Sequence, residues 1–93
     1  MVYKSLEDAV EAAKKNDQRA FGFLYDECWD YIYGYVFKIS KDERIAEELS
    51  LKTLSKAFDK IDKFNSEFKF KTWVITICKN LHIDYIRKKN TSN

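Results

Sequence analysis

The sequence predicts an all-α fold: a compact bundle of three long helices preceded by a short N-terminal helix. The 93 residues contain no proline and only two glycines, so the chain has few of the turn residues that an all-β fold needs. Apolar residues recur at three- and four-residue steps, the spacing of amphipathic helices. Hydrophobic residues make up 45% of the chain and charged residues 34%, which is typical of a globular domain. We expect a single domain over residues 1–93.

The short first helix is expected to begin after Ser5, a favourable N-cap residue, with Asp8 three positions later as its capping partner. Asn16 and Asp17 are typical of the turn that ends it. Its apolar face would consist of Leu6, Val10 and Ala13.

The second helix is expected from about Arg19 to Ile39. Gly22 and Gly34 would each cost about 1 kcal/mol relative to alanine inside a helix, a cost that the close approach of a neighbouring helix would explain. The core face is predicted to contain Phe21, Leu24, Cys28, Ile32, Tyr35 and Ile39.

The third helix is expected to open at "SKDE", with Ser40 as N-cap and Glu43 as the reciprocal residue of a capping box. Its pattern ends at Ile61, and the polar stretch 62–69 is predicted to be a loop. The fourth helix would run from about Phe70 to Lys88, while "RKKNTSN" (residues 87–93) is expected to fray. The two helices would bury Ile45, Ala46, Leu49, Thr53, Leu54, Ala57, Phe58 and Ile61, then Phe70, Val74, Ile77, Cys78, Leu81 and Tyr85.

Charge is divided unevenly along the chain. Residues 1–50 carry seven Lys/Arg against eleven Asp/Glu, a net −4, whereas residues 51–93 carry ten against four, a net +6. This asymmetry suggests two different partners, the second of them polyanionic.

The chain has no apolar stretch of about 20 residues and no visible signal peptide, so we expect a cytoplasmic protein without membrane insertion. The two cysteines, Cys28 and Cys78, fall within apolar helical patterns. Buried reduced thiols are therefore expected, although a disulfide between them stays open at this point.

Leu51 lies about 200° around the third helix from Leu49, outside the apolar stripe and beside Glu47, Glu48 and Lys52. An exposed leucine surrounded by charges suggests an anchor for a protein partner. A singly exposed leucine is also ordinary in proteins, and the spacing does not decide between the two.

The loop and the fourth helix combine aromatic and cationic residues. Rings at Phe64, Phe68 and His82 could stack on bases while lysines follow the phosphates, which favours single-stranded nucleic acid. The alternative is that the rings belong to the core and the lysines to a solvated surface; for Phe70 and Trp73 the spacing favours the core. The cations are Lys63, Lys69, Lys71, Lys79, Arg87, Lys88 and Lys89.

Little in the sequence points to catalysis. His82 is the only histidine, so no serine–histidine–acid set is suggested, and there is no glycine-rich phosphate loop. Cys28, Cys78 and His82 form only a weak candidate metal site, because they lack a ligand spacing signature. We expect no enzyme activity, no cofactor and no metal.

The run "IAEELSLKTLSKAFDKIDKFNSEFKFKTWVITICKNLHIDYIRKK" (residues 45–89) resembles region 2 of the extracytoplasmic-function (ECF) group of bacterial sigma factors, without a gap. "AFGFLYDECWDYIYGYVFKIS" (residues 20–40) resembles the opening helix of that region. Positions in register with the family pattern include Ala46, Glu47, Leu49, Thr53, Ala57, Phe64, Phe70, Trp73, Ile77, Asn80, Leu81, Ile83, Asp84 and Arg87.

The resemblance implies the sigma-70 region 2 fold and docking of the third helix on the clamp helices of the RNA polymerase β′ subunit. Leu51 and Lys52 replace the usual Gln and Glu, which leaves the polar detail of docking open. The implied polymerase-binding residues are Glu47, Glu48, Leu51 and Lys52.

The resemblance also implies that the loop captures a base of the melted non-template −10 strand and that the last helix follows the DNA. Ser66 and Lys69 stand where the family usually has proline, and Asp84 could instead play a structural part. The implied DNA-binding residues are Phe64, Asn65, Ser66, Phe68, Lys69, Lys71, Lys79, Asn80, Ile83, Asp84 and Arg87.

Two further expectations follow from the resemblance, and two alternatives to it stay open. An anti-sigma factor would be a further partner, and the C-terminal region 4 domain of the family would be absent from this chain. The alternative is a helical protein-interaction module, for example one that binds an anti-sigma factor without touching DNA; a general single-strand binder without polymerase contact is another.

Overall fold

The computed structural model describes residues 3–91 and confirms the all-α prediction. Its helices are α1 (Leu6–Lys14), α2 (Gln18–Ser40), α3 (Glu43–Asp59) and α4 (Phe70–Thr91), with a short 3₁₀ helix, η1 (Ile61–Lys63), after α3. The described residues contain no strand. None of these helices is long and apolar enough to cross a membrane.

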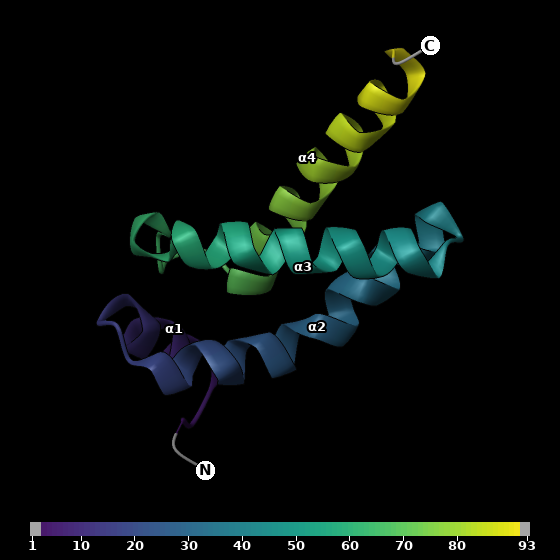
Figure 1. Ribbon diagram of the computed structural model, residues 1–93. Helices are drawn as coiled ribbons and strands as arrows, with labels where there is room; N and C mark the ends of the chain where they lie inside the picture. The colour runs from purple at the N-terminus through teal and green to yellow at the C-terminus, as the bar shows by residue number, and fades with distance from the viewer. Residues whose placement is uncertain (1–2, 92–93) are drawn as a thin grey trace.

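The helices form a bundle from which one end of α4 projects. Figure 1 shows α2 and α3 running side by side in opposite directions, with α1 beside the start of α2. The first half of α4 packs against α3 and α2, and its second half extends away from the other helices. The molecule is accordingly elongated, with extents of 47 × 23 × 20 Å.

The core lies where α2 meets α1, α3 and α4. Leu24, Cys28 and Ile32 are completely buried on α2, as their spacing predicts. The prediction fails at the end of this helix, because Val36 is buried whereas Ile39 is 43% exposed. Val36, four residues beyond Ile32, stays on the buried face. Ile39 is on about the same side of the helix, but it lies in the last turn of α2, which ends at Ser40.

The start of α1 confirms the Ser5 cap, whose hydroxyl accepts a hydrogen bond of 3.1 Å from the Asp8 N–H. The Asp8 carboxylate in turn accepts from the Lys4 N–H at 3.2 Å, one residue before the cap. Asp17 caps α2 and also accepts the Tyr3 hydroxyl at 2.8 Å. This hydroxyl bond lowers the pKa of the Asp17 carboxyl, because it favours the charged form.

The capping box predicted at Ser40 is wrong. α2 continues through Ser40, and Lys41 then adopts a left-handed conformation with φ of 58°. Asp42 is therefore the N-cap of α3, and its carboxylate accepts from the N–H groups of Arg44 at 2.9 Å and Ile45 at 3.2 Å. α2 extends one residue beyond its predicted end and includes Ser40, so only Asp42 has the extended conformation that an N-cap needs.

The end of the chain is more helical than predicted. α4 includes residues 87–91, which were expected to fray; residues 92 and 93 lie outside the described residues. The third and fourth helices bury their predicted faces, with Ile45, Phe58, Ile77, Leu81 and Tyr85 only partly covered. The last fully buried residue of α4 is Cys78, and the side chains after it are half-buried or exposed.

The two glycines of α2 do not serve helix packing. A Cβ atom added at Gly22 or Gly34 would meet nothing within 4 Å, and neither residue has a positive φ. The expected close approach of a neighbouring helix is therefore wrong, and both glycines lie on the exposed side of α2.

The two cysteines are free thiols buried in the core, as expected, and are not joined by a disulfide. Burial raises the pKa of Cys28 to about 11 and also raises the pKa of Cys78, because the apolar surroundings disfavour the thiolate. Both groups are therefore protonated near neutral pH, which makes them weak nucleophiles and weak metal ligands.

Replacing Gly34 by alanine should raise the free energy of unfolding by about 1 kcal/mol, because alanine loses less backbone entropy in a helix. Gly22→Ala should give a similar gain, and the two gains should add. Urea denaturation followed by circular dichroism measures both. Ser55→Ala, on the exposed side of α3, is a control that should gain only a few tenths of a kcal/mol. A loss of stability at either glycine would contradict the open space around it.

The native thiols should react slowly with an aromatic disulfide reagent at pH 8. A pKa near 11 leaves Cys28 about 100-fold less thiolate than an ordinary cysteine has, and burial restricts access further. The rate at Cys28, measured in Cys78→Ala, should keep rising to about pH 11, whereas in 8 M urea it should level off near pH 9. Equal rates in the folded and unfolded protein would contradict this.

Candidate nucleic-acid interface

The first candidate surface lies on the outer face of α3. Successive 100° steps place Glu47, Glu48, Leu51 and Lys52 within about 140° of the helix circumference. All four are exposed, and Leu51 is 47% exposed, so the structure brings the four predicted residues together. Leu51 is thus an apolar side chain on an otherwise charged helix face.

The charges around Leu51 are weakly engaged with one another. Lys52 forms an ion pair of 3.3 Å with Glu48, one turn earlier, and both side chains are more than half exposed. Such a pair is worth only about 0.3–0.5 kcal/mol. A partner could therefore rearrange these side chains at little cost.

The second candidate surface begins in the loop of residues 64–69, where Phe64 and Phe68 have opposite environments. The Phe64 ring is only 5% exposed and packs against Phe70 at 5.4 Å and Trp73 at 4.9 Å between ring centroids. It has no exposed face for a base, so the expectation of stacking on Phe64 is wrong for the folded chain. Phe68, in contrast, is 67% exposed and can offer its ring to a ligand.

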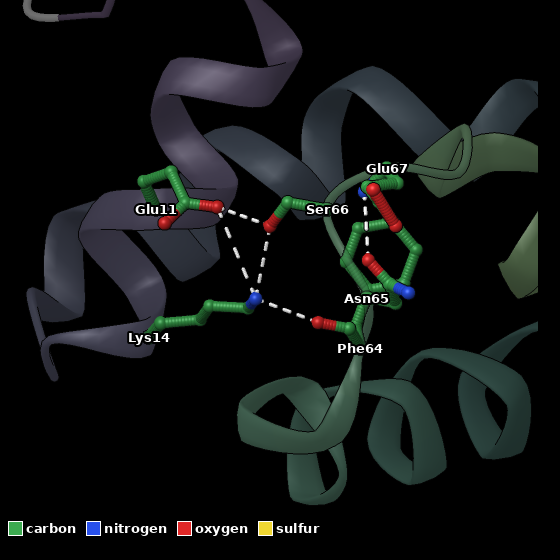
Figure 2. A network of polar contacts seen from close by, with 6 residues as sticks. All are labelled: Glu11, Lys14, Phe64, Asn65, Ser66 and Glu67. Atoms are coloured by element: carbon green, nitrogen blue, oxygen red, sulfur yellow. Dashed lines mark hydrogen bonds and ion pairs between the residues drawn. The ribbon is translucent and has the colours of Figure 1, made fainter.

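Asn65 shapes the turn between these two rings. Its side-chain oxygen accepts the Glu67 N–H at 2.9 Å, and its backbone carbonyl accepts the Phe68 N–H at 3.0 Å. Figure 2 shows the amide nitrogen of Asn65 on the side away from Ser66. The oxygen of this amide is therefore engaged in the turn, while its two N–H donors face outward.

The loop is also bonded to α1, a contact that the sequence did not predict. The Lys14 ammonium donates to the Phe64 carbonyl at 2.6 Å and to the Ser66 hydroxyl at 2.9 Å, and the same hydroxyl donates to Glu11 (Figure 2). Lys14 and Glu11 also form an ion pair of 3.9 Å. The loop residues lie 50 to 55 residues from Lys14 and Glu11 in the chain, and local patterns give no signal for these contacts.

The face of α4 that follows the loop is exposed and mostly cationic. Lys79, Ile83 and Arg87 are spaced four residues apart and lie along one side of the helix, with Asn80 beside them. All four are exposed, and Ile83 is 48% exposed. Lys69 is also exposed, at the end of the loop. The predicted residues of the loop and of α4 are thus exposed, apart from the buried Phe64 and the partly buried Lys71.

Two lysines of α4 lie over tyrosine rings of α2. The Lys71 ammonium is 5.4 Å from the centroid of Tyr31, and that of Lys79 is 6.0 Å from Tyr35. Cation–π contacts at such exposed sites contribute about 0.5–1 kcal/mol. These contacts extend the cationic face of α4 onto α2. They bring in Tyr35, which its spacing had assigned to the core, and Tyr31, which had not been assigned.

Asp84 is exposed on α4, one turn after Asn80, and it lines a groove of about 550 Å³ between this helix and α3. The groove is also lined by Lys52 of the α3 surface and by Arg87 of the α4 surface, so it connects the two candidate surfaces. The remaining lining residues are Leu49, Leu81, Tyr85 and Lys88.

The described residues hold no group of three or more His, Cys, Asp or Glu side chains that could bind a metal ion. Cys28 and Cys78, the candidates from the sequence, are buried and protonated near neutral pH, while His82 is half-buried on α4. The arrangement is suited to binding macromolecules through charge, ring and hydrogen-bond contacts.

Comparison with known proteins gives a consistent result. The family model described as Sigma-70 region 2 matches residues 24–91. The chain is 36% identical over 80 residues to the ECF RNA polymerase sigma factor SigW of Bacillus subtilis, covering 86% of this chain and 43% of that protein. It is 32% identical over 81 residues to BldN, an ECF RNA polymerase sigma factor of Streptomyces coelicolor, covering 86% of this chain and 31% of the relative. The chain thus spans less than half the length of these relatives.

Proposed function

Because the chain belongs to the sigma-70 region 2 family, we propose that it is the helical domain of an ECF sigma factor that binds core RNA polymerase and promoter DNA. Its role would be that of a transcription initiation factor and not of an enzyme. The observation that carries the proposal is the arrangement of two exposed surfaces on one core: the α3 surface (Glu47, Glu48, Leu51, Lys52) and the loop–α4 surface. The loop–α4 surface consists of Asn65, Ser66, Phe68, Lys69, Lys71, Lys79, Asn80, Ile83 and Arg87.

The α3 surface would dock on the clamp helices of the polymerase β′ subunit. Leu51 supplies an apolar centre. Burying a leucine side chain fully contributes about 1.5–3 kcal/mol, and about half of this remains to be gained on docking because Leu51 is 47% exposed. Glu47, Glu48 and Lys52 around it would steer association and set orientation. A helical partner with an apolar stripe bordered by charges suits this surface.

The loop–α4 surface would capture the melted non-template strand of the −10 element. Extruding a base costs a few kcal/mol. Stacking on an exposed ring such as Phe68 returns about 1–3 kcal/mol, and the lysines of α4 add a salt-dependent attraction to phosphates. Strand separation would then be driven by binding and would need no ATP.

Asn65 would supply base selectivity through its amide donors. Its oxygen is bonded to the Glu67 N–H, so only the N–H donors can read a base edge. This geometry favours a base that presents an acceptor, such as the O4 of thymine or the O6 of guanine.

The groove between α3 and α4 supports a second candidate, a protein-interaction module such as an anti-sigma binding domain. The groove is lined by Leu49, Leu81 and Tyr85, and Ile83 and Ile86 are exposed on the projecting part of α4. Reversing the charges of Lys79 and Arg87 separates the two functions. The substitutions should abolish DNA binding in a sigma domain and have no effect on the activity of a pure interaction module.

Leu51→Asp should weaken binding to a purified β′ clamp-helix fragment by at least tenfold, because it places a charge at the apolar centre of the docking surface. Isothermal titration calorimetry with the 93-residue chain measures this effect. Phe68→Ala is the reciprocal control: it should leave clamp-helix binding unchanged and weaken binding of single-stranded −10 DNA. If Leu51→Asp bound the fragment as well as the wild type does, the α3 docking surface would be wrong.

Asn65→Asp should change which base is preferred at the captured position. The carboxylate can still accept the Glu67 N–H and preserve the turn, but it offers an acceptor where the amide offers donors, so preference should move toward the amino groups of cytosine or adenine. Affinities for four oligonucleotides that differ only at that position give the ranking. Asn90→Asp, exposed near the end of α4, controls for the added negative charge. An unchanged ranking in Asn65→Asp would contradict the assignment.

A further inference from the structure

The loop of residues 64–69 has few internal constraints. Its own hydrogen bonds are those that Asn65 makes to the N–H groups of Glu67 and Phe68. The chain contains no proline that could restrict the backbone. A loop that presents Asn65 and Phe68 in one orientation therefore needs support from another part of the molecule.

That support comes from the last turn of α1. The Lys14 ammonium has three donors, and it has three acceptors around it: the Phe64 carbonyl, the Ser66 hydroxyl and, at ion-pair distance, the Glu11 carboxylate. It also lies 5.6 Å from the centroid of the Phe64 ring. The side chain is only 22% exposed, so its charge is directed to the loop rather than to solvent or phosphate.

The contacts with α1 hold only one side of the loop. Phe64 and Ser66 are bonded to Lys14, while the amide nitrogen of Asn65 points away from these contacts (Figure 2) and Phe68 is 67% exposed. The bonds to Phe64 and Ser66 therefore orient Asn65 and Phe68 without covering their side chains.

α1 is itself anchored firmly enough to act as a support. Ala9, Val10 and Ala13 are buried with at most 1% exposure, and the helix packs against α2, η1 and the start of α4. It precedes residues 24–91, the part of the chain that matches the family model.

We propose that α1 is a positioning element for base capture, in which Lys14, assisted by Glu11, fixes the loop through Phe64 and Ser66. The inference rests on the proposed function, because it concerns the loop that would receive the base. A loop held in its binding conformation loses less conformational freedom when it captures a base, and this increases affinity and selectivity. Lys14 would act through the loop and would not itself contact the DNA.

The test compares Lys14→Met with Lys15→Met in the full 93-residue chain. Methionine keeps most of the apolar stem of lysine and removes its donors. Both variants lower the net charge by one, and the exposed Lys15 side chain has no hydrogen bond or ion pair to the loop among residues 3–91. General electrostatic losses on DNA are thereby matched between the two proteins.

The probe is a fluorescent single-stranded DNA 12-mer selected from a random pool on the wild-type chain. Abasic substitution at each position locates the captured base, and the ratio of affinities for the intact and abasic strands measures capture alone. Phosphate contacts contribute equally to both strands and cancel in this ratio.

Lys14→Met should lower this capture ratio by about 3- to 10-fold, the effect of losing charge-assisted hydrogen bonds, whereas Lys15→Met should leave it unchanged. Lys14→Arg should restore most of the ratio, because it keeps a charged donor. Ser66→Ala, an exposed loop substitution that leaves the core intact, should lower the ratio by a smaller amount and add little to Lys14→Met.

Equal capture ratios in Lys14→Met, Ser66→Ala and wild type would overturn the positioning role while leaving the proposed function standing. A wild-type chain for which no abasic position reduces affinity would instead show that the proposed base capture fails, and the inference would fall with it. Circular dichroism melting identifies unfolded variants; if Lys14→Met unfolds, the ratios of Lys14→Arg and Ser66→Ala decide the outcome by the same criteria.

Discussion

The packing of the Phe64 ring into the core is the interaction on which the candidate DNA surface depends. The ring meets Phe70 and Trp73 at the start of α4, so one side chain fixes both the end of η1 and the beginning of the last helix. With the ring held inside, the Phe64 carbonyl faces Lys14, and the residues that follow are forced outward. A loop that could be taken for a flexible connection thus has a defined starting direction, and the exposure of Phe68 is the consequence.

The division of charge along the sequence becomes a division of surfaces in the fold. α3 carries Glu47 and Glu48 on its outer face, whereas the loop and α4 carry six Lys or Arg against two acids, Glu67 and Asp84. The groove that holds Asp84 lies between the two surfaces and contains both signs of charge. The loop and α4 therefore carry a net positive charge, whereas α3 carries both signs, as the Lys52–Glu48 ion pair shows.

The sequence was most informative where the spacing of apolar residues left only one helix face that could be buried. The stripes that contain Leu24, Cys28 and Val74 are buried as predicted, because a core of this size leaves helices of such spacing only one face to bury. It was least informative where neighbouring residues compete for one role. Ser40 and Asp42 are both good N-caps, and the choice followed from how far α2 extends. The contact of Lys14 with the loop had no local signal, since it depends on how α1 packs across the bundle.

The projecting half of α4 links fold stability to binding. Beyond Cys78 the side chains are at most half-buried, yet Asn80, Ile83 and Arg87 lie there, on the surface proposed to follow the DNA. The first half of α4 packs against α2 and α3 and provides the template on which these turns continue. A strand of DNA bound along this face would neutralise its cations and favour the helical form, and binding and helix formation would reinforce each other. The cationic side chains therefore have a fixed direction near the loop, where the core holds α4, and a direction that depends increasingly on the ligand toward Thr91.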